Sequence, residues 1–452
     1  MQDLYLSALN QVNTMMNKLH TLCPVFCGIV LLTTTHAQAE NSPITLNGFA
    51  SAGFISGDLD HNFYSGTDVI SKSSTFGADN TIGLQISAAM NEQINFTGQL
   101  LAKGTIDGYG LESHWAFIDY HPTNHLSIRA GRLVLPIVMS SEYIDVGYAY
   151  PWVRPPLEVY SGIPMTTYSG VDMLYTLEFD SFNLVLQPYI GSLPPSDSIG
   201  YQMDVELGAG LNTTLQFDAG SVRAQAMTVK NVVGTESSGL FTFGMDANIY
   251  ALGADLEYNN VVFMSEYMLK KFEFTGIPGY SDVEGNAWYV TLGYRMGKFL
   301  PHITYATADM DTNQAPALQV IMTDLLAQNP ALAGYLQSNP ALMQAFMSDP
   351  VTALQSLDTS NPAVQQLLAS IDPNALAMLA SAPDLANMLL PPAPLFYKQD
   401  SVTVGVRYDI LPKTALKLEY QEIKPKEESW GLFATDPGDK VHLASFVIDI
   451  TF

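Results

Sequence analysis

Basic side chains recur at regular positions along this chain of 452 residues. Many short segments alternate apolar with polar residues, and several carry a cation on the polar side: Lys103, Arg223, Arg407 and Lys417. Successive side chains of a strand point to opposite faces, so these cations would all lie opposite an apolar face. Charges that line a narrow passage select ions. The pattern therefore points to ion selection.

Sites for catalysis or for a cofactor are not evident in the sequence. There is no glycine-rich phosphate-binding loop, no paired metal-ligand motif and no Ser/His or Asp/His pair at a suggestive spacing. His121 and His125 would share one face of a helix, but they flank Pro122 in a predicted turn. We therefore expect no metal, no cofactor and no enzymatic activity.

The elements that must position the cations are strands of about ten residues separated by turns, a pattern typical of transmembrane barrels. Residues 94–104, 250–258 and 402–409 show it clearly. A soluble β-sandwich would also alternate, but here polar faces recur on nearly every strand. Aromatic residues at strand ends suit a girdle at a membrane interface. The girdle candidates are Tyr258, Tyr294, Tyr408 and Phe452.

The last segment, HLASFVIDITF, alternates up to the final residue. An unpaired strand edge is costly in lipid, so we expect this segment to close a barrel by pairing with the first strand. Short turns alternate with long loops (58–80, 143–172 and 276–286), and about sixteen strands result. The predicted fold is all-β, an antiparallel transmembrane β-barrel with an α-helical insertion in a late extracellular loop.

The N-terminus has the features of an export signal. Residues 1–39 combine a basic Lys18, a short apolar stretch and an A-x-A cleavage site that ends at Ala39. Met16 is an alternative start of this leader. Both cysteines lie inside it, so the processed chain would hold no disulfide.

Residues 313–397 interrupt the alternation. The segment holds no Lys or Arg, and Asn-Pro or Asp-Pro dipeptides recur in it every ten to twelve residues. Asn or Asp caps a helix and Pro suits its first position, so each dipeptide predicts the start of a short helix. Such helices are unstable alone, so they would form a cap or an apolar groove. Strands 1–13 would then occupy 40–312, and strands 14–16 would occupy 398–452.

The chain resembles the general porins of Gram-negative outer membranes. NTIGLQISAAMNEQINFTGQLLAKG and HWAFIDYHPTNHLSIRAGRLVLPIV look like the second to fifth strands of that family, and Phe452 matches its C-terminal aromatic residue. The resemblance implies a homotrimer of passive channels for small hydrophilic solutes and ions. It also implies a multi-pass barrel in the cell outer membrane, in contact with lipid and lipopolysaccharide, whose Phe452 is recognised by the barrel-assembly machinery.

A constriction loop at about 143–172 is a further implication of the resemblance. In the family, acidic residues of this loop face arginines of the wall; here Asp145 and Glu158 would face Arg129 and Arg132. Alternation turns Arg129 inward and Arg132 outward, unless a bulge at Gly131 reverses this. The predicted constriction set is Lys103, Arg129, Arg132, Asp145, Arg154, Glu158, Arg223, Arg407 and Lys417.

The charge balance narrows the possible partners. Acidic residues number 44 against 19 basic ones, which argues against a nucleic-acid partner and suggests a weak cation preference. Two alternative functions stay open. One is a barrel-anchored binding protein or adhesin that uses 313–397 as its receptor or cap. The other is an outer-membrane enzyme that depends on a lumen-facing or mouth-facing histidine.

Overall fold

The computed structural model describes residues 43–452, apart from 58–62, 66–67, 71–73, 77–78, 106–107, 162–165, 199–200, 237–241, 276–281, 312–325, 328, most of 349–396, 427–428 and 434–435. The predicted signal peptide, 1–39, lies outside the described residues. So do the ends of several loops and most of the second half of the insertion.

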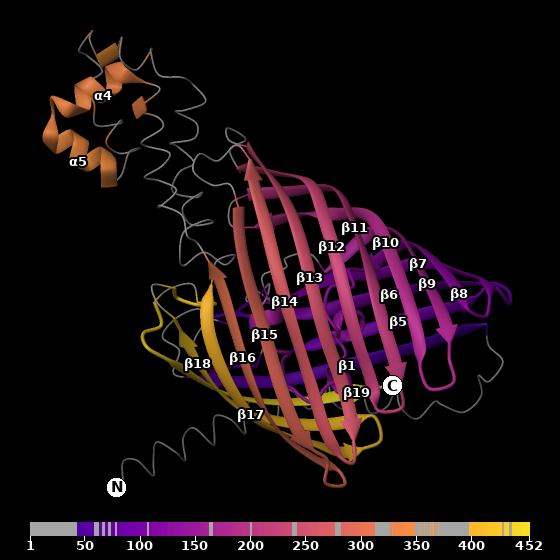
Figure 1. Ribbon diagram of the computed structural model, residues 1–452. Helices are drawn as coiled ribbons and strands as arrows, with labels where there is room; N and C mark the ends of the chain where they lie inside the picture. Colours follow the sequence, from indigo (N-terminus) through magenta and orange to yellow (C-terminus); the bar gives the residue numbers. More distant parts are fainter. Residues whose placement is uncertain are drawn as a thin grey trace, which may run out of the picture.

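The described residues form a closed antiparallel barrel of sixteen long strands (Figure 1). The strands are β1 (Ile44–Gly57), β5 (Thr81–Ala89), β6 (Ile94–Thr105), β7 (Gly108–Thr123), β8 (Leu126–Val134), β9 (Thr167–Glu178), β10 (Asn183–Ser198), β11 (Tyr201–Phe217), β12 (Gly220–Glu236), β13 (Thr242–Tyr258), β14 (Val261–Thr275), β15 (Asp282–Tyr294), β16 (Phe299–Asp311), β17 (Lys398–Leu411), β18 (Thr414–Pro425) and β19 (Val441–Thr451). The predicted fold class is confirmed.

Closure occurs where the sequence predicts it. β19 pairs with β1 in a register that runs from Phe49 opposite Thr451 to Gly57 opposite Leu443. Gly48 and Phe452 exchange two backbone hydrogen bonds of 2.9 Å. A Cβ at Gly48 would lie 2.3 Å from Cζ of Phe452, so the absence of a side chain at position 48 lets the terminal ring lie against the first strand. The first and last strands thus share a continuous ladder from Gly48 to Gly57, and a lipid environment favours such closure over an open edge.

Short turns join the strands at one end of the barrel, which we call the turn end. The connections that follow β5, β7, β9, β11, β13, β15 and β17 are two to four residues long. Asn259 and Asn260, which join β13 to β14, both have positive φ angles, as a tight hairpin turn of two residues requires. β7 continues through Pro122 to Thr123, so the turn predicted around Pro122 lies at 124–125.

The opposite end, which we call the loop end, differs in detail from the prediction. The first loop contains the short strands β2 (Phe63–Ser65), β3 (Asp68–Ile70) and β4 (Ser74–Thr75), and β4 pairs with β1. Only 106–107 separate β6 from β7, so the connections at this end are not all long. The third loop spans 135–166 and not 143–172, because residues 167–172 pair with β8 and β10 as the start of β9.

The outer face of the barrel is apolar. Large hydrophobic side chains are exposed along it on nearly every strand. Examples are Ile44, Leu46, Leu84, Ile86, Leu100, Ile118, Val171, Ile190, Leu211, Leu252, Tyr267, Leu292, Ile303, Val404 and Leu418. A continuous apolar surface of this extent is unfavourable in water and suits hydrocarbon.

The inner face has two zones, so the predicted polar inner face is only partly right. From the middle to the turn end it is polar: Gln99, Arg129, Asp172, Gln187, Asn212, Gln225, Glu266, Thr291, Thr304, Thr403, Lys417 and Asp449. Toward the loop end it is buried and apolar: Ile55, Leu133, Leu193, Val205, Val232, Phe243, Phe272, Phe274, Val283, Met310, Ile423, Val441 and Leu443. The apolar residues belong to one hydrophobic cluster that also includes the third loop.

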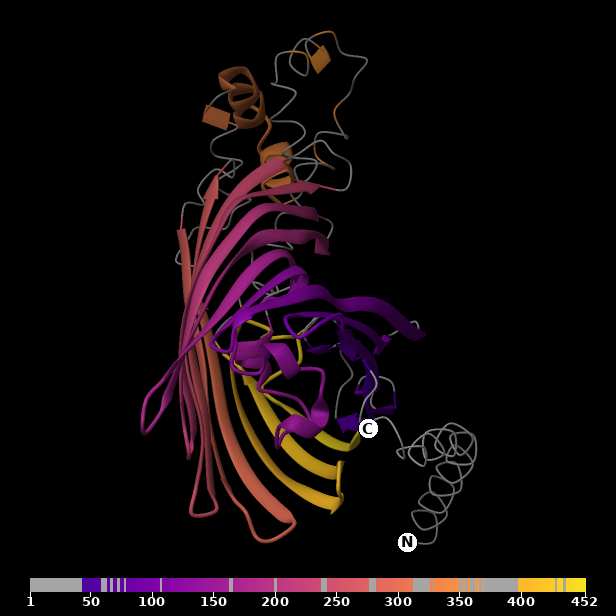
Figure 2. The ribbon, with the colours of Figure 1, turned by 90° about the vertical axis from the view of Figure 1, so that its right-hand side faces the viewer.

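One wall of the barrel is taller than the other. β11, β12 and β13 have 17 residues each, whereas β5 and β8 have 9. Figure 2 shows the taller wall, coloured magenta to orange, rising above the indigo strands. About 9–11 residues cross a bilayer, so these strands extend beyond the span, and the inner face of the extension is mainly apolar.

Two helices of the insertion are described, and both begin at predicted dipeptides. α4 (Pro330–Gln337) follows Asn329, and α5 (Pro340–Ser348) follows Asn339. Leu332, Leu336 and Phe346 are buried, as their helical spacing predicts. Both helices lie beyond the loop end of the barrel (Figure 1). Among the described residues, no helix is long and apolar enough to cross a membrane.

Candidate constriction site in the lumen

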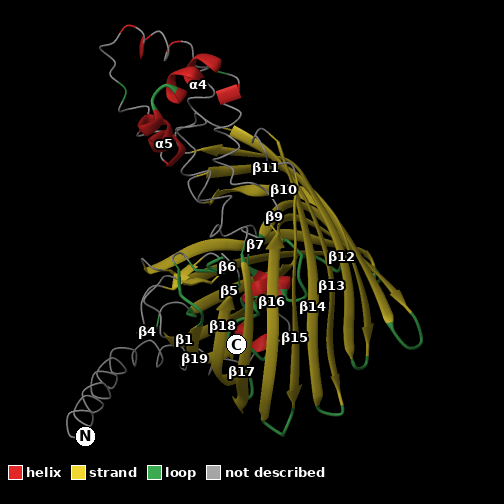
Figure 3. Ribbon diagram, turned by 60° about the vertical axis from the view of Figure 1, so that its left-hand side comes forward, coloured by secondary structure: helices red, strands yellow, loops and turns green. Residues whose placement is uncertain are grey.

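The third loop, 135–166, folds into the barrel; we call it the lumen loop. It contains two 3-10 turns, η2 (Ser141–Tyr143) and η3 (Gly147–Ala149), and the short helix α2 (Leu157–Tyr160). Figures 2 and 3 show these elements inside the ring of strands. The turns of the loop satisfy some of its backbone groups internally, as between Val146 and Tyr143, and other buried backbone groups need partners from side chains of the wall.

Three predicted cations of the wall bind backbone carbonyls of the lumen loop. Arg223 donates to the oxygens of Pro136, Val138 and Met139 at 3.3–3.5 Å. Arg407 donates to the oxygens of Tyr148 and Tyr150 at 2.7 and 3.1 Å. Lys417 donates to the oxygens of Gly147 and Trp152 at 2.5 and 2.7 Å. These cations therefore hold the loop in place instead of facing an open passage.

Two acidic residues of the wall bind backbone N–H groups of the same loop. Glu266 accepts from the N–H of Met139 at 2.6 Å and from the hydroxyl of Tyr160 at 2.5 Å. Glu419 accepts from the N–H of Val153 at 2.9 Å. Both residues lie on polar strand faces, and alternation places them inside the barrel. The sequence alone gave no sign that they pair with the loop backbone.

Trp152 anchors the middle of the lumen loop. Its indole N–H is 3.1 Å from the hydroxyl oxygens of both Thr291 and Thr304. Its ring meets Tyr289 edge to face, with 5.4 Å between ring centroids. The side chain is fully buried, so the loop packs directly against β15 and β16 here.

Arg129 points inward as alternation predicts, but its acidic partners differ from those implied by the resemblance. It pairs with Asp172 of β9 through both its Nε and Nη2, and with Glu142 of the lumen loop at 3.0 Å. Asp172 also accepts from Gln187, which in turn accepts from Asn212. The arginine is thus part of a hydrogen-bonded row on the wall.

Asp145 faces Lys103 and His114 instead of an arginine. Its carboxylate is 2.7 Å from Nζ of Lys103 and 3.3 Å from Nε2 of His114. A register shift between β6 and β7 makes His114 an extra residue, so His114 and Trp115 both lie on the lumen side. Alternation alone cannot reveal a bulge, and the expected pair of Asp145 with an arginine is therefore wrong.

The bulge considered at Gly131 is not formed. Pairing of β8 with β7 and β9 runs through Gly131 without a shift, and Arg132 stands opposite Ala116. Gly131 has a φ of +141°, and a Cβ there would lie 2.3 Å from the oxygen of Ala116, so glycine is required for close strand approach. Arg132 is partly buried and does not pair with Asp145 or Glu158.

The remaining predicted loop residues bind other parts of the barrel, namely the first loop and the strands β17 and β19. Arg154 pairs with Asp79 at 3.1 Å and donates to the hydroxyl of Ser445 at 2.6 Å. Glu158 is fully buried, and its Oε1 accepts from Gln399 at 2.7 Å. Glu158 therefore does not form the pair with Arg129 or Arg132 that the resemblance implies, because α2 packs against β14, β15 and β16.

The ionisation of Glu158 gives a testable pH dependence. Burial raises the pKa of this carboxyl above its ordinary value near 4.5. Below pH 4.5 the carboxyl is protonated in both the folded and the unfolded chain, and the folded protein keeps its full stability. The folded protein loses stability as the pH rises through the raised pKa, because the buried carboxyl must then ionise. We expect the unfolding temperature of Glu158→Gln to exceed that of the wild type increasingly between acidic and neutral pH. Thermal unfolding of detergent-folded protein across a pH series measures this; a gap that closes as pH rises would contradict it.

The predicted girdle residues all lie near the turn end. Tyr258 and Tyr294 are the last residues of β13 and β15 and are exposed. Tyr408 stacks on Phe299 with 4.5 Å between centroids. Phe452 lies against Gly48 at the closing seam. Their shared level fits a girdle, and that role stays a prediction.

Comparisons with known proteins agree with this architecture. No protein-family profile and no curated protein matches the chain. Among solved structures, outer-membrane expressed OmpT of Vibrio cholerae is similar at 11% identity and a TM-score of 0.50, covering 92% of this chain and 100% of that one. The outer membrane channel DcaP of Acinetobacter baumannii is similar at 13% identity and a TM-score of 0.50, covering 92% and 99%. Similarity at such low identity shows a common barrel fold.

Proposed function

We propose that this protein is an outer-membrane channel of a Gram-negative bacterium, which passes small hydrophilic solutes and ions by passive diffusion. The observation that carries the proposal is a closed barrel, apolar outside, with a loop held inside its lumen. A closed barrel is one of the two backbone arrangements that satisfy all hydrogen bonds in lipid. The similar DcaP structure is itself described as an outer membrane channel.

The proposed membrane setting includes further expected partners. The exposed hydrophobic belt would contact outer-membrane lipid, and the loop end would face lipopolysaccharide and the exterior. Phe452 would serve as the signal for the barrel-assembly machinery, and the predicted signal peptide would direct export. A homotrimer is proposed on the resemblance to general porins.

The constriction proposed for this channel differs from a ring of free charges. Arg223, Arg407 and Lys417 bind the lumen-loop backbone. Lys103 with Asp145, and Arg129 with Glu142, remain as ion pairs between strands of the wall and the lumen loop. Both lie toward β6–β8, so we propose that solutes pass along this side. A weak cation preference is expected from the excess of acidic residues.

The insertion is proposed to cap the loop end rather than to serve as a receptor. Leu332, Leu336 and Phe346 are buried, so these side chains of α4 and α5 do not offer a free apolar groove. Tyr397 belongs to the barrel. Its hydroxyl donates to the backbone oxygen of Glu158 at 2.7 Å, and its backbone oxygen accepts from the N–H of Met310 at 3.4 Å. The proposed cap therefore ends before Tyr397.

Planar-bilayer recording tests both proposals. The wild type is expected to conduct ions, and deletion of 313–396 to conduct at least as well, because a cap can only obstruct the mouth. A folded protein that conducts no ion would refute the channel. Under the adhesin alternative, deletion abolishes binding to a cell surface while conductance stays unchanged, and this result would refute the cap.

A further inference from the structure

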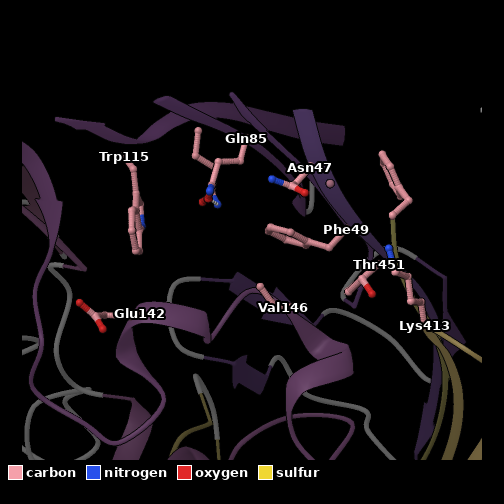
Figure 4. Close-up of a pocket in the computed structure, with 11 residues that line it drawn as sticks. Asn47, Phe49, Gln85, Trp115, Glu142, Val146, Lys413 and Thr451 are labelled. Carbon is pink, nitrogen blue, oxygen red and sulfur yellow. Dashed lines mark hydrogen bonds between the residues drawn. The ribbon is translucent and has the colours of Figure 1, made fainter. Parts of the chain in front are cut away.

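A cavity lies between the lumen loop and the wall near the turn end, beside the Arg129–Glu142 ion pair. Its volume is about 320 Å³. The wall contributes side chains from β1, β5, β6 and β7, and the loop contributes Glu142 and Val146. Figure 4 shows Trp115, Gln85, Asn47, Phe49 and the two loop residues arranged around this space. A volume of this size accommodates a small ligand.

Two aromatic rings border the cavity, and a bulge in β7 and a glycine in β5 determine their positions. The bulge at His114 keeps Trp115 on the lumen side, opposite Gln99. Gly83 of β5 lies under Phe49, since a Cβ at Gly83 would lie 2.2 Å from Cζ of that ring. Any larger residue at position 83 would displace Phe49. Flat aromatic surfaces thus border the cavity from two different strands.

Side-chain amides supply the polar groups of the cavity. Gln99 donates to Oε1 of Gln85 at 3.1 Å, and Gln85 donates to the hydroxyl of Ser87 at 3.4 Å. Asn47 adds a third amide. Amides offer donors and acceptors side by side, which is what hydroxyl groups require.

The formal charges at the cavity are balanced. Arg129 pairs with two carboxylates, those of Asp172 and Glu142, and the one excess negative charge of this group is offset by Lys413. Lys413, in the turn after β17, is the only cation that lines the described cavity. A charged ligand would therefore gain little, whereas an uncharged ligand loses little on desolvation.

We propose that this cavity binds one ring of an uncharged sugar. The C–H faces of the ring would pack on Trp115 and Phe49, and its hydroxyls would bond to Asn47 and Gln85. The inference deepens the proposed channel, since it names the solute class that pauses on the turn-end side of the lumen loop, and it rests on that function.

Isothermal titration of the detergent-folded protein with D-glucose tests the inference without a conductance measurement. We expect saturable binding, and a loss of affinity of about tenfold in Trp115→Leu and in Gln85→Leu, because each removes one side of the site. Trp288→Leu is the matched control, because alternation places Trp288 on the outer face beside Tyr305; its affinity should equal that of the wild type.

Charged analogues and conductance separate the possible outcomes. D-glucosamine and D-glucuronate should bind at least about tenfold more weakly than D-glucose, and D-glucose should reduce the ion current of the wild type. The inference would be overturned by any of three results: no saturable glucose binding, wild-type glucose affinity in both Trp115→Leu and Gln85→Leu, or tighter binding of either charged sugar than of D-glucose. Failure to conduct ions would instead refute the channel proposal, while the titration still reports on the cavity.

Discussion

Replacing Lys417 with methionine is expected to release the lumen loop from the wall. Nζ of Lys417 is 2.8 Å from Asp449, and both side chains are almost completely buried. The substitution would leave that carboxylate without its counter-charge and the oxygens of Gly147 and Trp152 without a donor. Breaking a buried pair on one side costs about 3–5 kcal/mol. Equilibrium unfolding of the folded barrel and bilayer conductance both measure the result, and the conductance is expected to rise.

A double variant and a surface variant make this result specific. Lys417→Met with Asp449→Asn removes both charges and should recover part of the lost stability, because no unpaired charge is then buried. Lys424→Met breaks an ion pair with Glu422 whose lysine is exposed, and no measurable change is expected. If Lys417→Met were as stable as Lys424→Met, the loop would not depend on this cation.

The second large effect is expected from Trp152→Ala. This side chain is 1% exposed, bonds to Thr291 and Thr304, and packs edge to face on Tyr289. Truncating a buried tryptophan costs about 3–5 kcal/mol through the cavity that is left. The same cavity would widen the lumen, so single-channel conductance should increase while the free energy of unfolding falls.

Trp288→Ala is the control for this change. Trp288 is on the outer face and contacts Tyr305 across the strands, with 5.4 Å between ring centroids. Its truncation leaves the lumen unchanged, so conductance should match that of the wild type. A Trp152→Ala channel with wild-type conductance and wild-type stability would mean that Trp152 neither narrows the pore nor stabilises the barrel.

Local pattern was sufficient to predict the strands and their closure. The alternation in residues 442–452 places Ser445, Asp449 and Thr451 on one face. That face lies inside the barrel, where Ser51 of β1 donates to Asp449 at 2.6 Å. The turns at 259–260 and 412–413 were also predictable, because polar, turn-forming residues separate alternating segments. Such features depend on neighbours in the sequence, and the sequence contains them.

The partners of the predicted constriction charges were not predictable in the same way. Lys417 and Gly147 are separated by 270 positions, and Trp152 and Thr304 by 152. The bulge at His114 shifts the parity of β7 by one residue without a local sequence signal. A shift of one residue exchanges the side chains that point inward with those that point outward. The inward position of His114 beside Asp145 could therefore not be assigned from the sequence.

The sequence by itself therefore determined a barrel with about sixteen strands, an apolar exterior and an inward-facing set of charges, because period-two alternation and turn chemistry are local. Only the tertiary structure decided what those charges do. Arg223, Arg407 and Lys417 meet backbone carbonyls of a loop that enters the lumen, where a buried backbone carbonyl without a hydrogen-bond donor is costly. Which groups meet is set by the closure of the barrel around the loop, a long-range property that no short segment contains.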